Sequence, residues 1–256
     1  MLFRNEKLDQ AFSFIKESEL DFFCLQEVPE TFLTRLKTLP YHVTYRIDAD
    51  RLFEEGISRS FNVILSRHPI SMQGDIPYPN YWSRLPWRVK VFVRGMRFMS
   101  FSKIENRGGM YIDALVGNTS VRVFNLHLIL AHPTLRSTEF ETAMQHLDPA
   151  RPTIICGDFN ILESLEISIL NWLSGGTIFD AIFFWRERRK TEKRFRALGL
   201  RNLLRGSVTH SFSRSQLDHI LITKEFTTKN AEVIPQVFGS DHHPVTAELR
   251  ESFDIS

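Results

Sequence analysis

The sequence has little cysteine, little net charge and no long apolar run. It contains two cysteines among 256 residues, and its formal net charge is +2. Cys24 and Cys156 both lie inside apolar runs, so we interpret them as buried free thiols, which favours a reducing setting. No segment reaches the ~20 apolar residues of a membrane span, and the first residues contain no stretch typical of a signal peptide. We therefore expect a cytoplasmic protein without membrane insertion, whose charge alone does not indicate a polyanionic partner.

The sequence does contain an alternation of strand-like and helical patterns. Apolar residues recur at helical spacing over 6–18 and 162–173, and shorter helices are expected at 30–38 and 137–147. Apolar runs predict strands at 21–28, 61–66, 89–93, 96–102, 110–116, 121–128, 153–156, 217–223 and 244–249. We find no internal repeat, low-complexity tract or linker, and therefore predict one domain over residues 1–256. Many strands with few helices predict an α/β fold in which two sheets pack face to face with helices outside.

Glu27 stands at the end of a predicted buried strand, directly after the apolar run 22–25. A carboxylate in such a place is poorly solvated unless a cation compensates it, and a divalent metal ion is the strongest candidate. The alternative is an N-cap or surface glutamate at the start of the helix expected at 30–38.

Asp158 and Asn160 flank Phe159 directly after another predicted strand and Gly157. In extended geometry the residues at i and i+2 point the same way, so both polar groups would face one site while Phe159 packs inward. The alternative is an Asx turn that leads into the next helix.

Histidines stand at the ends of two further segments. His127 follows Asn125 on an apolar strand, where a hydrogen-bonded core histidine is the ordinary alternative to a catalytic one. His242 lies in the sequence Ser-Asp-His-His-Pro at 240–244, without the further ligands that a structural zinc site needs. An acid that hydrogen-bonds a histidine fixes its tautomer and raises its basicity, so we predict a dyad of Asp218 and His242.

In their order along the chain, four motifs resemble those of the endonuclease/exonuclease/phosphatase superfamily, which includes pancreatic deoxyribonuclease, abasic-site endonucleases, sphingomyelinases and inositol-phosphate phosphatases. The motifs are Leu-Gln-Glu-Val at 25–28, Asn-Leu-His-Leu at 125–128, Gly-Asp-Phe-Asn at 157–160 and Ser-Asp-His-His-Pro at 240–244. The resemblance implies a four-layer α/β/β/α sandwich of two mainly antiparallel sheets. It also implies hydrolysis of phosphate esters with Mg²⁺ or Mn²⁺.

On the metal side, the resemblance implies that Glu27 is the main ligand and that Asp241 is a further metal-side or orienting acid. Family members usually begin with a strand that carries an asparagine beside this glutamate. Glu27 stands too near the start of the sequence for that strand, so we expect the first strand to be missing. Either the start of the gene is placed late, which we favour, or the protein lacks a central strand and a metal-site residue.

On the catalytic side, the resemblance implies roles for five residues. Asp218 orients His242, His127 contacts the phosphate, and Asp158 supplies an acid. Asn160 holds a phosphoryl oxygen through its amide without adding negative charge. Either His242 or Asp158 would activate the water molecule.

Two stretches outside the motifs concern the substrate. A loop rich in Pro, Tyr, Trp and Arg contains Trp82, Arg84 and Trp87, which together with Asn125 we predict to bind substrate. Aromatic rings with arginines can stack bases and contact phosphates, and the alternative is a loop pinned to the domain by its tryptophans. Residues 186–205 are markedly basic, which is typical of a segment that follows a nucleic-acid backbone or of a solvated helix or mobile loop.

We therefore predict a divalent-metal-dependent phosphoesterase, with nucleic-acid phosphodiester bonds as the expected substrate. One alternative keeps the same site but acts on phospholipid or sugar-phosphate head groups. Another is a catalytically inactive binding module on the same scaffold. No stable protein partner is implied.

Overall fold

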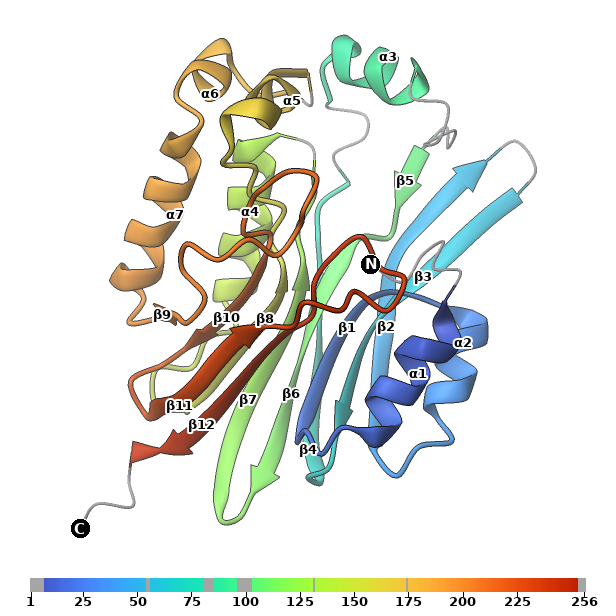
Figure 1. The fold of residues 1–256 in the computed structure, drawn as a ribbon, viewed down its shortest axis with the longest axis vertical. Helices are drawn as coiled ribbons and strands as arrows, with labels where there is room; N and C mark the ends of the chain where they lie inside the picture. Colours follow the sequence, from blue (N-terminus) through green and yellow to red (C-terminus); the bar gives the residue numbers. More distant parts are fainter. Residues whose placement is uncertain are drawn as a thin grey trace.

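Two large β-sheets dominate the computed structural model, which describes residues 7–53, 56–80, 85–95, 103–130, 132–173 and 175–252 (Figure 1). The first sheet is antiparallel and has the order β1-β3-β2-β5. Its strands are β1 (Phe22–Pro29), β2 (His42–Phe53), β3 (Gly56–Ser66) and β5 (Lys103–Glu105). The second sheet has the order β4-β6-β7-β8-β10-β9, and within it β7 and β8 form the parallel pair. Its strands are β4 (Ile70–Pro77), β6 (Gly108–Val116), β7 (Thr119–His127), β8 (Thr153–Asp158), β9 (Arg201–Asn202) and β10 (Asp218–Ile222).

Helices cover the outer face of each sheet. The helices α1 (Leu8–Glu17) and α2 (Glu30–Leu36) lie against the first sheet, and α4 (Pro133–Met144) and α7 (Trp185–Ala197) lie against the second (Figure 1). Shorter helices gather at the upper end of the molecule in Figure 1. They are α3 (Trp87–Gly95), η3 (Leu165–Ile167), α5 (Ser168–Leu173) and α6 (Ile178–Ile182). None of the helices described has both the length and the apolar character that crossing a bilayer requires.

Three apolar layers hold the sheets and helices together. The first lies between α1, α2 and the first sheet, with Phe32 and Val63 fully buried. The second fills the space between the two sheets, around Ile64, Ile112 and Val123. The third joins the second sheet to α4 and α7 through Phe124, Phe159 and Phe195, which together with the other two gives four layers of secondary structure. The predicted α/β/β/α sandwich of mainly antiparallel sheets is confirmed.

One local prediction is wrong and one lies outside the described residues. The predicted strand at 89–93 is part of α3, which buries Val89 completely and leaves Val91 exposed. Its short alternation of apolar and polar residues is compatible with either structure, and the helix wins because only one side finds a partner. Of the alternatives for the basic stretch 186–205, the structure has the helix, α7, which exposes most of its cations and buries Phe195. The strand predicted at 96–102 lies outside the described residues.

A cavity of about 920 Å³ separates β1 from β12 (Val245–Glu251), which pairs with β11 (Phe226–Val233) in a separate ribbon. The strand β1 is an edge strand that pairs only with β3 among the described strands. The Arg67 N–H donates to the Asp21 carbonyl, so every second residue of β1 counted from Asp21 directs its backbone N–H and C=O toward β3. Cys24 lies between such residues, so its backbone N–H and C=O point away from β3 and toward the cavity. Apolar side chains of both strands line the cavity, and no strand lies in it among the residues that the structure describes.

The two cysteines lie on the walls of this cavity and form no disulfide. The predicted free thiols are confirmed, although each is half-buried rather than fully buried. A hydrogen bond with the Cys156 thiol, together with burial, raises the pKa of Cys24 well above its usual value. The Cys24 thiol therefore stays protonated at neutral pH, which makes it a weak nucleophile.

Candidate active site

Asp158 lies where β8 ends, and the backbone is unusually close to β7 at this point. The preceding residue, Gly157, has φ +144°, and a Cβ there would stand 1.8 Å from the carbonyl oxygen of Leu126. Glycine is therefore required at this position. Because β7 and β8 are parallel, His127 and Asp158 stand side by side at the carboxyl ends of the two strands.

The turn that follows is closed by the Asp158 carboxylate itself. Its Oδ1 accepts a hydrogen bond from the backbone N–H of Asn160 at 2.8 Å, which is the Asx turn considered from the sequence. Asn160 has φ +53° and donates from Nδ2 to the carbonyl of Leu128 at 2.8 Å. Phe159 packs inward as predicted and is fully buried. One carboxylate oxygen of Asp158 thus closes the turn, and the other is left for the site.

The structure brings His242 and Asp218 into contact. Nδ1 of His242 lies 2.8 Å from Oδ2 of Asp218, and the Asp218 backbone N–H donates to Oγ1 of Thr209. Burial lowers the pKa of His242, but the carboxylates of Asp218 and Asp158 outweigh it and raise this pKa to about 9. Burial in turn raises the pKa of Asp218, and the His242 ring outweighs it, so this carboxyl titrates below its usual range.

A second histidine–aspartate pair is formed by His127 and Asp48. Nδ1 of His127 lies 3.1 and 2.9 Å from the two carboxylate oxygens of Asp48, which is fully buried. Asp48 is placed there by a register shift in β2 between Ile47 and Ala49. Burial opposes the charged forms, yet the attraction between the two groups raises the pKa of His127 and lowers that of Asp48 to about 2.

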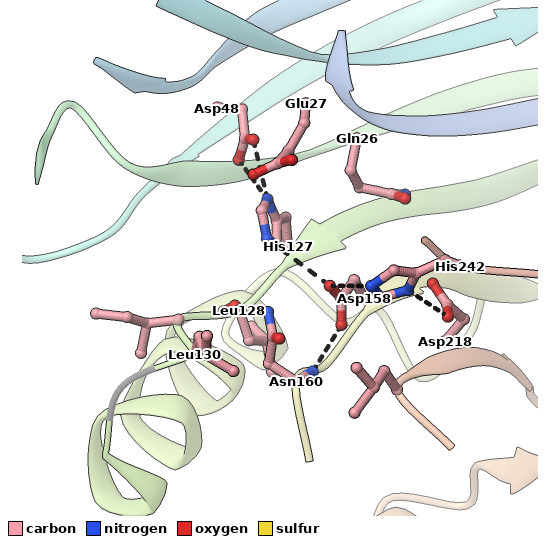
Figure 2. A network of polar contacts seen from close by, with 12 residues as sticks. Gln26, Glu27, Asp48, His127, Leu128, Leu130, Asp158, Asn160, Asp218 and His242 are labelled. Atoms are coloured by element: carbon pink, nitrogen blue, oxygen red, sulfur yellow. Dashed lines mark hydrogen bonds and ion pairs between the residues drawn. The ribbon is translucent and has the colours of Figure 1, made fainter. Parts of the chain in front are cut away.

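The two pairs converge on one oxygen of Asp158, as Figure 2 shows. Nε2 of His127 and Nε2 of His242 each lie 3.9 Å from Asp158 Oδ2. This oxygen is buried and has no hydrogen-bond partner among the residues described. Burial is the main reason why the pKa of Asp158 is raised, and the nearby Asp218 carboxylate adds to it. Two imidazole nitrogens and one unpartnered carboxylate oxygen therefore face a common space.

Glu27 reaches the site from a bulge in β1. The register with β3 shifts between Leu25 and Val28, and Glu27 has φ +55°, an uncommon conformation for a residue other than glycine. Its carboxylate is buried and forms an ion pair with the guanidinium of Arg51. The alternative role as an N-cap is wrong, because Pro29 occupies the N-cap position of α2.

Asn125 joins the two sheets behind the site. Its Oδ1 accepts from Nε2 of Gln26 at 2.6 Å, and its Nδ2 donates to the carbonyl oxygens of Leu25 and Val63 at 2.9 and 3.0 Å. Asn125 is fully buried, so this amide fixes β1 and β3 relative to β7. Contact of Asn125 with a substrate stays a prediction.

A model of the Endonuclease/Exonuclease/phosphatase family matches residues 2–242. The chain belongs to this family. No curated protein sequence matches the chain.

Solved structures of the family share the fold at low sequence identity. An endonuclease/exonuclease/phosphatase from Beutenbergia cavernae DSM 12333 has a TM-score of 0.68 at 18% identity, over 96% of this chain and 66% of that chain. The catalytic domain of human Nocturnin has a TM-score of 0.62 at 16% identity, over 98% and 88%. Mannosyl-6-phosphatase Bt3783 from Bacteroides thetaiotaomicron VPI-5482 has a TM-score of 0.57 at 16% identity, over 96% and 91%. At these identities the likeness shows the fold alone.

The donor set of the site fits a hard divalent cation, as expected of this family, whose enzymes are divalent-metal dependent. Donor atoms of Glu27, Asp48 and His127 lie within 4.8 Å of one another, and a second such group adjoins it through Asp158. Carboxylate oxygens are the preferred ligands of Mg²⁺ and Mn²⁺. A cation would compensate the unpartnered Asp158 Oδ2, and at Glu27 it would compete with the Arg51 guanidinium for the carboxylate.

Asp241 is exposed, and its carboxylate lies 4.0 Å from Nε2 of His210 in a third group of possible metal donors that includes His242. Trp82 and Arg84 lie outside the described residues. Trp87 opens α3 with 77% of its surface exposed. A metal-side role for Asp241 and substrate contacts of the other three stay predictions.

Sequence reasoning missed three site residues: Asp48, Arg51 and His210. Asp48 stands between Ile47 and Ala49 in a stretch for which no strand was predicted, so its burial in β2 was missed. The sequence does hold one signal for its burial, namely an aspartate between two apolar residues in a strand-like run. His210 faces the His242 ring at a centroid distance of 4.7 Å and comes from a loop with no periodic pattern.

Proposed function

We propose that this chain is a divalent-metal-dependent phosphodiesterase. The observation that carries the proposal is the convergence of two histidine–aspartate pairs on the unpartnered oxygen of Asp158. Each aspartate holds the Nδ1 side of its ring, so that Nε2 of His127 and of His242 is directed at the common space. Paired imidazoles of this kind can move a proton to or from oxygen atoms on either side of a phosphate.

The roles follow from the positions of the side chains. A bound divalent cation supplies charge that stabilises a phosphoryl oxygen. His242 exchanges a proton with the attacking water or the leaving oxygen, and Asp218 keeps its ring oriented. His127, held by Asp48, and Asn160 stabilise the phosphoryl oxygens as negative charge develops.

The charge of the site favours a diester over a monoester. The carboxylates of Glu27, Asp48, Asp158 and Asp218 outnumber the two histidines with raised pKa values, and the nearby Arg51 guanidinium is already paired with Glu27. A phosphomonoester carries close to two negative charges at neutral pH, whereas a diester carries one. Binding a monoanion in this acidic surrounding costs less electrostatic free energy.

Hydrolysis of bis-p-nitrophenyl phosphate and of p-nitrophenyl phosphate tests the proposal, with Mg²⁺, Mn²⁺ or EDTA. We expect metal-dependent cleavage of the diester that is lost in Glu27→Ala and His242→Ala. His243→Ala is the matched control, because His243 adjoins His242 but bonds Ser211 and the Ile234 carbonyl instead. Faster cleavage of the monoester, or equal loss in His243→Ala, would contradict the assignment. No cleavage at all would favour an inactive binding module.

For the substrate class, we keep nucleic acid as the first candidate. It is supported by the exposed cations of α7, namely Arg186, Arg189, Lys190 and Lys193, which have no ion-pair partner among the residues described. Binding to single- and double-stranded DNA over a range of salt concentrations tests this candidate. A steep loss of affinity with salt supports it, and a flat response contradicts it.

A phospholipid head group is the second candidate, and a different observation favours it. The helix α6 exposes Ile178, Phe179 and Ile182, an apolar surface that a nucleic-acid enzyme does not need. Release of water-soluble phosphate products from phospholipid vesicles, compared with cleavage of DNA and RNA, separates the two candidates.

A further inference from the structure

The helix α6 is apolar but buries none of its residues. Four of its five residues are Ile, Phe, Ala and Ile, and Ile178, Phe179 and Ile182 expose 52%, 54% and 56% of their surface. An apolar helix normally forms because it packs against a core. The capping box of Thr177 and Asp180 fixes the start of α6 instead, so the structure maintains this exposed helix by local hydrogen bonds.

The exposed apolar surface continues on both sides of α6. After the helix, the Phe183 ring stacks on Phe179 at a centroid distance of 6.4 Å and meets Trp185 edge-on at 5.7 Å. Before it, α5 contacts α6 and exposes Ile169. We call this surface the α6 ridge, and it consists of Ile169, Ile178, Phe179, Ile182, Phe183 and Trp185. Contiguous exposed apolar groups of this kind mark interaction sites.

Positive charge follows the ridge directly in the chain. Arg186, Arg189, Lys190 and Lys193 are exposed at the start of α7, and no ion pair engages them in the described ranges. Two nearby carboxylates, those of Asp180 and Glu187, already have partners. Asp180 accepts the capping bonds of Thr177, and the Glu187 carboxylate pairs with Arg136. The ridge is therefore bordered by unneutralised cations.

We propose that the α6 ridge is a docking surface for an anionic lipid membrane. Its aliphatic and aromatic side chains would enter the boundary between head groups and acyl chains, and the α7 cations would contact anionic head groups. Aromatic rings beside arginines also suit stacked bases, but half of the ridge is isoleucine, which has no flat face for stacking. The mixture fits hydrocarbon better than nucleobases.

The ridge lies at the same end of the molecule as the candidate active site. The strands β7 and β8 both run toward this end and deliver His127 and Asp158 there, and the chain continues from Asp158 into α5 and α6 (Figure 1). A membrane under the ridge would bring head groups to the site, which favours the phospholipid candidate. The docking proposal itself does not depend on catalysis.

Co-sedimentation with lipid vesicles tests the proposal without any activity measurement. We expect binding to vesicles of phosphatidylcholine with phosphatidylserine, and weaker binding to phosphatidylcholine alone. The double variant Phe179→Ser, Phe183→Ser should lose at least tenfold in affinity. Phe212→Ser is the matched control, because Phe212 is an aromatic residue outside the ridge that is 78% exposed. Arg189→Glu with Lys193→Glu should weaken binding about tenfold, and Lys16→Glu on α1 should not.

Two further measurements keep the outcome decisive. Tryptophan fluorescence should shift to shorter wavelength on vesicle binding, and Trp185→Phe should remove most of that shift while leaving the protein folded. Thermal unfolding of each variant shows whether a loss of binding is a loss of fold.

The proposal is overturned if neither vesicle type binds, or if Phe212→Ser weakens binding as much as the ridge variant. A concentration-dependent dimer that the ridge variant abolishes would assign the surface to a second copy, and oligonucleotide binding lost in the same variant would assign it to nucleic acid.

Discussion

Replacing Asp218 with asparagine is expected to lower the pKa of His242 in the metal-free chain. Burial lowers this pKa, and three interactions raise it from its ordinary 6.5 to about 9: the charges of Asp218 and Asp158 and the hydrogen bond to Asp218. Two of the three belong to Asp218. We therefore expect a fall of at least about one unit, which corresponds to about 1.4 kcal/mol of lost stabilisation of the imidazolium.

Titration of the histidine ring signals by NMR measures this change directly. The His242 signal is assigned by its disappearance in His242→Ala, and the asparagine variant is then titrated beside the unaltered chain. Asp241→Asn is the matched control, because Asp241 is adjacent in the chain but more exposed, and it lies near His210. If the pKa of His242 were the same in Asp218→Asn as in the unaltered chain, the pairing would not be the cause of the shift.

The same pair makes stability depend on pH. The folded-state pKa of His242 is about 9 and its ordinary value is 6.5, so its protonated form contributes stability that is fully present below pH 6.5 and is lost as the pH rises through 9. The free energy of unfolding in urea should therefore differ most between the unaltered chain and Asp218→Asn below pH 6.5. The difference should shrink toward pH 9. A difference that grew over this window would refute the reasoning.

Three other substitutions give separate tests. Asp48→Asn should reduce diester hydrolysis by about 10- to 100-fold with the fold retained, because Asp48 orients His127; activity together with circular dichroism checks this. Arg51→Met should tighten Mn²⁺ binding measured by calorimetry, because the guanidinium now pairs with the Glu27 carboxylate; unchanged affinity would mean that the two cations do not compete. Phe159→Ala should destabilise the protein by about 3–5 kcal/mol in urea unfolding, because the ring is fully buried, and a loss below 1 kcal/mol would contradict its place in the core.

The sequence predicts those parts of the fold and of the site that depend on residues close together in the chain. The motif around Asp158 could be predicted because a buried strand, a glycine and a turn follow one another directly. The contact of Asp218 with His242 could be predicted because each stands just before or at the start of an apolar strand. In both cases strand ends carry the polar groups, which is a property that a sequence displays.

The features that the sequence did not predict depend on β-bulges and on which face of a helix or strand packs against another element. Asp48 reaches His127 only because a register shift turns its side chain into the interior, and such a shift leaves no periodic signal. The strand predicted at 89–93 became a helix because the apolar side of α3 found a partner on one face only. A metal-side role for Asp241 was inferred from its place in a motif and stays a prediction; its exposed carboxylate lies beside His210 and His242. Position in a motif constrains chain order but does not fix the direction of a side chain.

The open space between β1 and β12 has a mechanical consequence. Gln26 and His242 stand on opposite walls of this cavity, and no backbone ladder crosses it within the described residues. The distance between these two walls is therefore set indirectly, through the Asn125 amide and the apolar layer between the sheets. A hydrogen-bonded ladder resists stretching, whereas apolar packing yields by sliding. The active site thus has one stiff side, built on β7, β8 and β10, to which Asp218 holds His242, and one compliant side at β1, and small movements of β1 would carry Glu27 toward or away from Asp158.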